Sequence, residues 1–559
     1  MSSAHLEGAA SWICGLSLGD VPNDVLDLAR TQRIDVFAAA AAGRTTRAGL
    51  AIVRAVDGWG VGRHVVPVLA SPRSMMGAAY ELAALAGVLE YDHWIFGGHT
   101  GQAAVSSALA VGLELGKDGR EILLAQIVAN EIGGRLGVLM TTGPQHGHMK
   151  SYMHRAAAAA ATARLLGLSR DATVHALALA LAQPEHGLFP GAFSSDEKAI
   201  AYADPTIAGI RAALLAAEGL RGVRNVVEHP VGLVAALSEA PYARDPWERL
   251  GHSYCLSAIS IKPVVACAYA AAATLAAAAI RDEIGADVAA RTRNVRVFAS
   301  ALTVSMESFS RPHDGTRITE VNTNFSTKRS VALALLEGAP YGESFARGRF
   351  EETAHAMGPL ARRVELRHDW KKTVALLRGI DAAIDHPGRP GVYGMAESHR
   401  TMDRFREQLG TKPFVAFGDL PALARLGPDA TYLLRRYARG YRARLPFLGG
   451  RAARAAYASS DTDLRAMSFA AGARVEVDLD DGRTIAREID LPRGFSGDPD
   501  RANVATEKFA REARRVMKAE EAIALGQALA SPFPAGRELE VCVAGTRLET
   551  TDRKGSVAS

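Results

Sequence analysis

Cysteine is scarce in this chain of 559 residues, which contains four of them: Cys14, Cys255, Cys267 and Cys542. They lie far apart, form no Cys-x-x-Cys pair and are not combined with histidine at zinc-finger spacing. We therefore expect neither a disulfide framework nor a structural zinc site. This use of cysteine is typical of a reducing compartment, so we predict a cytoplasmic protein.

Aromatic residues and excess charge are also limited. Aromatic side chains make up 6% of the sequence, and 65 basic against 60 acidic residues leave a formal net charge of +5. Basic residues are not interleaved with aromatic ones, as a groove for single-stranded nucleic acid would require. We expect no nucleic-acid partner, whereas a pocket for a small anion needs only a few basic side chains.

Uninterrupted apolar runs of membrane-spanning length are absent from the sequence, because a charge, a proline or another polar residue breaks each candidate. The first residues, Met1–Trp12, have no basic segment ahead of an apolar core, as a signal peptide would. We expect no contact with a membrane.

Hydrophobic residues, at 48% of a long chain, are sufficient for a large core and for more than one domain. Apolar periodicity and alanine-rich runs predict helices in the first half, at Gly101–Leu115, Arg120–Met140, His154–Leu166, Asp171–Ala182 and Tyr269–Ala279. The composition changes after about residue 290. Alternating patterns then predict strands at Asn294–Ala299, Arg363–Leu366, Arg474–Leu479 and Thr484–Ile489, with a hairpin turn at Asp480–Arg483 between the last two.

These patterns predict a mainly α protein, with a large helical domain and a smaller α+β unit. We place the helical domain at 1–285 and 496–530, the α+β unit at 286–495, and a peripheral tail at 531–559. A stretch at about 370–465, rich in Arg, Leu, Gly and Pro, is expected to be an inserted subdomain with helical segments around 401–409 and 420–439.

The most informative segment is Glu90-Tyr91-Asp92-His93-Trp94, followed by Gly97-Gly98-His99-Thr100-Gly101. It places two carboxylates and two imidazoles between two apolar helical segments. These side chains are the ones most often used for general acid and base catalysis, and the glycines allow a turn to bring them together. The alternative is a polar loop whose carboxylates cap helices.

Further short motifs follow this segment in a fixed order. They are Glu131-Ile132-Gly133-Gly134-Arg135-Leu136-Gly137, His148 before the alanine-rich helix, Lys198, Ile261-Lys262-Pro263 with Cys267, Leu491-Pro492-Arg493-Gly494, and Lys508-Phe509. Together with the acidic segment, this order resembles the MmgE/PrpD family, which includes 2-methylcitrate dehydratase and cis-aconitate decarboxylase. The resemblance implies an all-helical domain, an α+β lid, a cleft between them and a homodimer.

The resemblance also implies proton transfer on small di- and tricarboxylates, with no cofactor. On that basis His99 and His148 are the expected proton-transfer pair, with Glu90, Asp92 and Lys198 as further catalytic residues. Lys262 and Arg329 are expected to bind substrate, and Arg135 either does so or pairs with Glu131. His93 and His146 are additional imidazoles that we assign to substrate binding. For each histidine the alternative is a hydrogen-bonded structural residue, and for Lys262 it is a solvated charge.

Several positions depart from the family pattern. The family motif Asp-Tyr-Asp-Asp-Thr is replaced by residues 90–94, so that Glu90 is longer by one methylene and Trp94 replaces a hydroxyl. Ala271 stands where a histidine is expected, and Arg329 where the lid usually has a tyrosine. Exchanging a phenol for a guanidinium removes a proton donor and adds a fixed cation. These changes argue against a standard methylcitrate dehydratase and favour a differently shaped, still anionic substrate.

We therefore predict a cofactor-free lyase or isomerase that acts on a small carboxylate. One alternative is an epimerase or tautomerase of a larger specialised metabolite, and another is a non-catalytic relative that binds a metabolite or a protein. A metal enzyme is a further possibility because His146 and His148 alternate and His93 lies near His99. The spacing matches no standard ligand set, however, and we expect no metal.

Overall fold

Long helices build the first half of the chain. The computed structural model describes residues 4–60, 62, 66, 68–69, 71–95, 98–139, 151–184, 189–237, 246–247, 250–310, 318–384, 420–433, 435 and 463–531. The helices of the first half are α1 (Ala4–Gly15), α2 (Asn23–Arg44), α3 (Arg47–Asp57), α4 (Met75–Gly87), α5 (Gly101–Glu114), α6 (Gly119–Leu139), α7 (Ser151–Leu166), α8 (Arg170–Leu181), α9 (Phe189–Ser194), α10 (Glu197–Ala217) and α11 (Leu233–Leu237). The helices predicted in this half are present.

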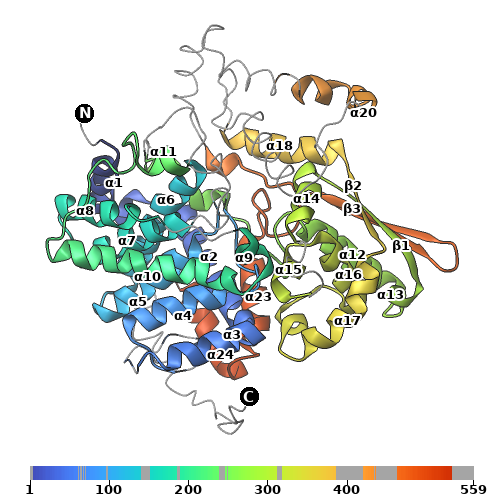
Figure 1. Cartoon of the computed structure of the whole chain (residues 1–559), viewed down its shortest axis with the longest axis horizontal. Helices are drawn as coiled ribbons and strands as arrows, with labels where there is room; N and C mark the ends of the chain where they lie inside the picture. The colour runs from blue at the N-terminus through green and yellow to red at the C-terminus, as the bar shows by residue number, and fades with distance from the viewer. Residues whose placement is uncertain are drawn as a thin grey trace.

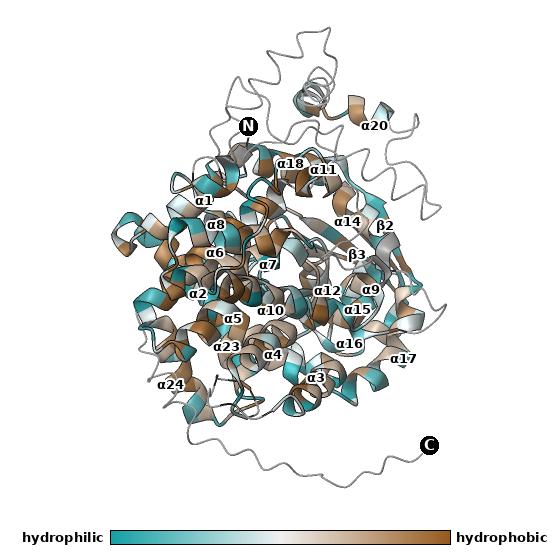
Figure 2. Cartoon of the chain, turned by 60° about the vertical axis from the view of Figure 1, so that its left-hand side comes forward, coloured by the Kyte–Doolittle hydropathy of each residue, from teal (hydrophilic) through white to brown (hydrophobic). Residues whose placement is uncertain are grey.

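Small side chains allow these helices to pack closely. The alanines at 156–161 in α7 are all buried, and α7 packs against α6 and α10. At Gly209 of α10, a Cβ atom would lie 2.3 Å from the Arg155 carbonyl oxygen, so only glycine permits this approach. Hydrophobic residues are frequent along α2, α5 and α6 (Figure 2). The core of this helical body therefore depends on short side chains and near backbone contact.

The second half contains further helices and a small sheet. Its helices are α12 (Ala271–Ile284), α13 (Val288–Arg291), α14 (Ala301–Met306), α15 (Glu320–Asn324), α16 (Thr327–Glu337), α17 (Arg349–Ala361), α18 (Trp370–Ile384), α20 (Leu420–Ala424), α23 (Arg501–Ala513) and α24 (Ala519–Ala530). Its strands are β1 (Thr292–Ala299), β2 (Val364–His368), β3 (Ala473–Leu479) and β4 (Thr484–Ile489). Short 3-10 helices lie at Leu18–Asp20, Cys255–Ala258, Glu307–Ser310, Gly342–Phe345 and Leu464–Ala466.

The four strands form one mixed sheet in the order β2-β1-β3-β4. Strand β1 pairs parallel with β2 and antiparallel with β3, and β3 pairs antiparallel with β4. Val295 and Val297 of β1 and Val475 and Val477 of β3 are fully buried, and α12 packs against β3 and β4. The predicted strands and the β3–β4 hairpin are confirmed, and so is the mainly helical fold class with a small sheet.

After the sheet the chain returns to the first helices. Helices α23 and α24 both pack against α2, on the side of the molecule that holds the first helices in Figure 1. The sheet and its helices lie on the other side of the molecule. The C-terminal helices thus contact the helical body directly, while our division into domains stays a prediction.

Two details differ from the sequence prediction. The predicted helix at 269–279 begins at Ala271 and continues to Ile284, where Gly285 with a φ of 114° ends it. The predicted helix at 420–439 is not continuous, because Gly427 takes a φ of 57° and Pro428 follows it. Most of the expected inserted subdomain, including 401–409, and the tail beyond residue 531 lie outside the described residues.

Helix α10 is long and apolar enough to cross a membrane, but 67% of its apolar window is buried inside the protein. It packs against α4, α7 and α8. Burial against three helices accounts for its composition, so α10 is a core helix.

Candidate functional site

The acidic segment forms the connection between α4 and α5, and it lies inside the molecule. Glu90, Asp92 and His99 are all buried, with His99 the most exposed at 8%. Glu90 has a φ of 54°, a left-handed conformation that costs free energy for a residue with a side chain. Gly101 is required here, because a Cβ atom would lie 2.0 Å from the His93 ring. The backbone thus turns sharply to direct these side chains inward.

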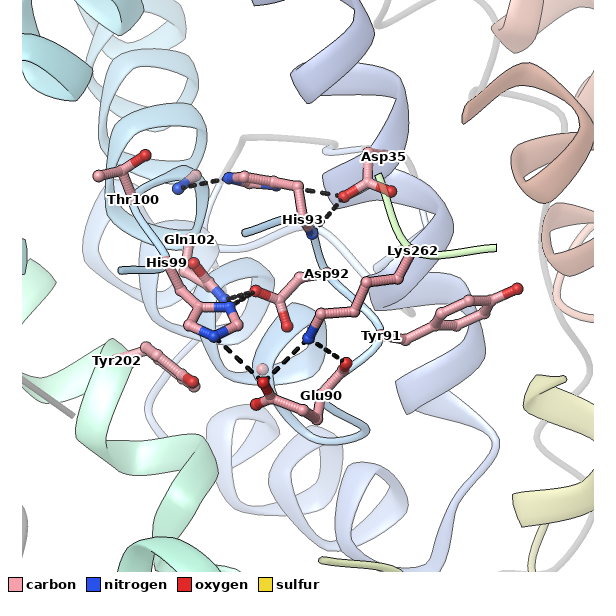
Figure 3. Close-up of polar contacts among 12 residues, drawn as sticks. Asp35, Glu90, Tyr91, Asp92, His93, His99, Thr100, Gln102, Tyr202 and Lys262 are labelled. Carbon is pink, nitrogen blue, oxygen red and sulfur yellow. Dashed lines mark hydrogen bonds and ion pairs between the residues drawn. The ribbon is translucent and has the colours of Figure 1, made fainter. Parts of the chain in front are cut away.

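His99 lies between two carboxylates (Figure 3). Its Nδ1 is 2.5 Å from Asp92 Oδ2, and its Nε2 is 3.1 Å from Glu90 Oε1. Burial alone would lower the pKa of His99, but the negative charges of Asp92 and Glu90 outweigh it and raise the pKa above its ordinary value. The same attraction overcomes the effect of burial on the carboxylates and lowers the pKa of Asp92 and of Glu90. The three groups therefore form a charged chain suited to holding a proton on His99.

Two lysines complete this arrangement, which we call the Glu90 cluster: Glu90, Asp92, His99, Lys198 and Lys262. Lys262 Nζ donates to the Glu90 carbonyl oxygen at 2.6 Å and to Glu90 Oε1 at 2.9 Å. Lys198 Nζ lies 3.0 Å from Glu90 Oε2 and also donates to the Gly87 carbonyl oxygen.

The charges of the Glu90 cluster do not cancel. With His99 protonated, three cationic groups face two carboxylates, which leaves one positive charge in a buried place. An unbalanced buried charge is costly, and an anion that enters would reduce that cost. Lys198 and Lys262, however, already contact Glu90. A substrate carboxylate must therefore share these lysines with Glu90 or displace it.

His93 belongs to a neighbouring network. Its backbone N–H and its Nδ1 both donate to Asp35 Oδ2, at 2.7 and 3.1 Å, and its Nε2 accepts from the Gly101 N–H at 3.1 Å. Because Nε2 accepts from the Gly101 N–H, the ring carries its proton on Nδ1, where it donates to Asp35. Lys508 Nζ in turn donates to Asp35 Oδ1 at 2.6 Å and to the Tyr91 carbonyl oxygen. Both nitrogens of His93 thus bind protein groups and hold the loop in place, while its role in substrate binding stays a prediction.

The other predicted site residues have separate surroundings. Arg135 donates to Glu131 Oε2 at 3.1 Å and to the Ser253 carbonyl oxygen. The contact with Glu131 is the pairing that we gave as the alternative to substrate binding. The Arg329 guanidinium donates to the carbonyl oxygens of Ser310 and Asn322, both at 3.0 Å. These contacts hold Arg135 to Glu131 and Ser253, and Arg329 to Ser310 and Asn322, while the role of both arginines in substrate binding stays a prediction. His146 and His148 lie outside the described residues.

Sequence reasoning did not single out the positioning residues. Asp35 lies within a buried run of α2. The sequence feature that could have identified it is a single acidic residue directly before a long apolar stretch. Gln102 donates to Asp92 Oδ2, and Tyr202 accepts from Lys198 at 3.3 Å, one helical turn along α10. The i to i+4 spacing of Lys198 and Tyr202 could have predicted that pair.

The Glu90 cluster also has the donor atoms of a metal site. One ligand atom each from Glu90, Asp92 and His99 lies within 4.8 Å of the other two. Both lysine ammonium groups, however, lie within 3.0 Å of the Glu90 carboxylate, where they would repel a divalent cation. This donor set does not fit a resident metal ion.

Residues 7–245 match the sequence model of the MmgE/PrpD N-terminal domain. This part of the chain is an MmgE/PrpD N-terminal domain. The family consists mainly of lyases, including dehydratases and decarboxylases of small carboxylates. The MmgE/PrpD domain supplies Glu90, Asp92, His99 and Lys198, whereas Lys262 and Lys508 follow it in the chain. No curated protein is similar in sequence to the chain.

Proposed function

We propose that this protein is a cofactor-free lyase or isomerase that transfers protons on a small carboxylate. The observation that carries the proposal is the buried Asp92–His99–Glu90 chain with Lys198 and Lys262 beside it. The MmgE/PrpD N-terminal domain supports the same chemistry, since lyases of small carboxylates belong to that family.

Each group has a distinct part in this proposal. Asp92 orients His99 through Nδ1, and His99 as imidazolium donates the proton on Nε2 to the substrate. Lys198 and Lys262 bind the substrate carboxylate and stabilise the negative charge that develops when a neighbouring C–H proton is removed. When the substrate binds, its carboxylate takes the place of the Glu90 carboxylate beside the two lysines. His148 stays our predicted base for this proton.

The contact of Glu90 with both lysines favours a second candidate function, which also depends on proton transfer. Because Glu90 already lies between the two lysines, the cluster could serve a substrate that does not bring a carboxylate to this place. Glu90 itself would then exchange a proton with the substrate, and the reaction would be an epimerisation or a tautomerisation of a larger metabolite.

Hydrogen exchange tests the proposal directly. The protein is incubated in deuterium oxide with a panel of small di- and tricarboxylic acids, and proton NMR follows loss of C–H signal and appearance of product. We expect exchange or turnover with at least one acid, and a loss of about a hundredfold or more in His99→Gln. The control is His175→Gln on α8, whose ring binds the Gly222 backbone instead of the Glu90 cluster. Equal rates in wild type and His99→Gln would contradict the proposal.

The proposal also includes a cytoplasmic location and a homodimeric assembly. The scarcity of cysteine supports a cytoplasmic location. The family resemblance supports a homodimer, which sedimentation equilibrium would test.

A further inference from the structure

His154 is a buried histidine to which neither the motifs nor the proposed mechanism gives a role. It lies near the start of α7 and is 1% exposed. Neither of its ring nitrogens has a hydrogen-bond partner in the part of the chain that the structure describes. Leaving a buried polar group unpaired is costly, and in native proteins such a group calls for an explanation.

Other buried histidines in the described residues show what a structural role requires. His93 uses both ring nitrogens, toward Asp35 and Gly101. His175 Nδ1 accepts from the Gly222 N–H at 3.3 Å. Their contacts hold elements of the fold together. His154 makes no comparable contact, so support of the fold does not explain it.

The surroundings of His154 connect it to the Glu90 cluster. Its ring stands at 90° to the Tyr202 ring, with the centroids 5.1 Å apart, and the Tyr202 ring is 6.1 Å from that of His99. Burial and the positive charge of His99 lower the pKa of His154 to about 3. His154 is therefore a neutral imidazole, with one donor and one acceptor nitrogen, beside a cationic cluster.

Other buried atoms of this region also lack a hydrogen-bond partner among the described residues, among them the acceptors Asp92 Oδ1 and Gln102 Oε1 and the donor Trp94 Nε1. Figure 3 shows Asp92 and Gln102 next to His99, and the centroid of the Trp94 ring lies 5.7 Å from that of His99. A hydroxyl group on a ligand can donate its one proton to one acceptor, such as an oxygen here or the unprotonated nitrogen of His154, and it can accept from the His154 N–H. A carboxylate can only accept, because it has no proton to donate.

We propose that His154 is a specificity-determining residue that contacts a hydroxyl group of the substrate. The inference rests on the proposed function, because it assigns this hydroxyl to the carboxylate substrate held by Lys198 and Lys262. The lysines then recognise the charged end of the substrate, and His154 recognises its neutral polar group. A 2-hydroxy or 3-hydroxy acid fits both requirements.

The test uses pairs of acids that differ by one hydroxyl: malate against succinate, and citrate against propane-1,2,3-tricarboxylate. Calorimetry measures the binding of each acid to wild type, His154→Leu, His154→Gln and His175→Leu. We expect wild type to prefer a hydroxylated acid by about tenfold or more, because a site built to bind a hydroxyl rejects the analogue that lacks it.

His154→Leu should reduce that preference to within about twofold without weakening the deoxy acid, since it removes only the hydroxyl contact. His154→Gln retains a donor and an acceptor and should keep part of the preference, and His175→Leu should keep all of it. The unfolding midpoint of His154→Leu should equal or exceed that of wild type, because an unpaired buried group is removed, whereas that of His175→Leu should fall.

Two results would overturn the inference while leaving the proposed function intact. One is an unchanged preference in His154→Leu, and the other is a loss of stability as large as that of His175→Leu. Failure of all four acids to bind wild type would overturn the proposed function and this inference together.

Discussion

Lys508 and Asp35 are 473 positions apart in the sequence, yet Lys508 Nζ lies 2.6 Å from Asp35 Oδ1, and both side chains are fully buried. Asp35 also accepts from the His93 backbone and ring, and Lys508 also donates to the Tyr91 carbonyl oxygen. Through this ion pair, helix α23 near the C-terminus holds the loop that carries Glu90 and Asp92. The geometry of the site therefore depends on a helix that follows the matched domain.

Replacing Lys508 by Met should be strongly destabilising. The change leaves the Asp35 carboxylate buried without its cation, and breaking a buried pair in this way costs about 3–5 kcal/mol. The double variant Lys508→Met with Asp35→Asn should recover part of that loss, because no uncompensated charge remains. Urea unfolding gives the free energies. Lys518→Met, at an exposed position, is the control and should change stability by less than about 0.5 kcal/mol. Equal stabilities for Lys508→Met and wild type would show that the pair contributes nothing.

Glu90→Gln should move the alkaline limb of the pH–rate profile. Glu90 is one of two carboxylates that raise the pKa of His99. Without its charge that pKa falls, so the protonated form needed for proton donation is lost at lower pH, by about one unit or more. The profile of kcat/KM against pH measures the shift. Glu197→Gln, an exposed carboxylate beside Lys198 in sequence, is the control and should leave the limb in place. An unmoved limb in Glu90→Gln would remove His99 as the donor.

Asp92 should make the fold sensitive to acid. Despite burial, which raises it, the pKa of Asp92 is lowered by His99, so the folded state favours the carboxylate. The resulting stability is present above the ordinary pKa of about 4 and is lost as the pH falls toward the lowered value. Asp92→Asn should therefore lose less stability than wild type between about pH 6 and pH 3. Thermal unfolding across this range measures both curves, and parallel curves would count against the ion pair.

Lys198 and Arg329 should respond differently to neutralisation. Lys198 lies in the Glu90 cluster, so Lys198→Met should weaken binding of a carboxylate by about 1–3 kcal/mol. Arg329 instead donates to Ser310 and Asn322, so Arg329→Met should reduce stability and leave affinity nearly unchanged. Calorimetry and thermal unfolding separate the two effects. Weaker binding in Arg329→Met at unchanged stability would support the substrate-binding role predicted for Arg329 from the sequence.

Removal of metal ions should not affect turnover. The ammonium groups of Lys198 and Lys262 occupy the neighbourhood of Glu90 in which a divalent cation would have to bind. Dialysis against EDTA should leave the rate of proton exchange unchanged, and elemental analysis should find less than one equivalent of metal. A rate that falls with EDTA and returns with one added metal would identify Glu90, Asp92 and His99 as ligands.

The sequence by itself determined the local elements. Helices such as α5, α6 and α8, and the hairpin of β3 and β4, follow from periodicity and turn residues within a few positions of one another. The sequence also places Glu90, Asp92 and His99 within ten positions of one another, so their side chains lie close together. Chemistry carried by neighbouring residues is readable from the sequence because the connecting chain is too short to separate them.

Only the tertiary structure decided which distant groups meet them. Lys262 reaches Glu90 across 172 positions, and Lys508 reaches Asp35 across 473. Such contacts depend on how whole helices pack, and packing is set by many side chains at once. From the sequence we predicted that His99 transfers a proton and that His93 and Arg329 bind substrate. The tertiary structure placed His99 beside Glu90 and Lys262, His93 beside Asp35, and Arg329 beside Ser310 and Asn322. These surroundings differ because the packing of whole helices, and not the local sequence, decides which groups share a buried place.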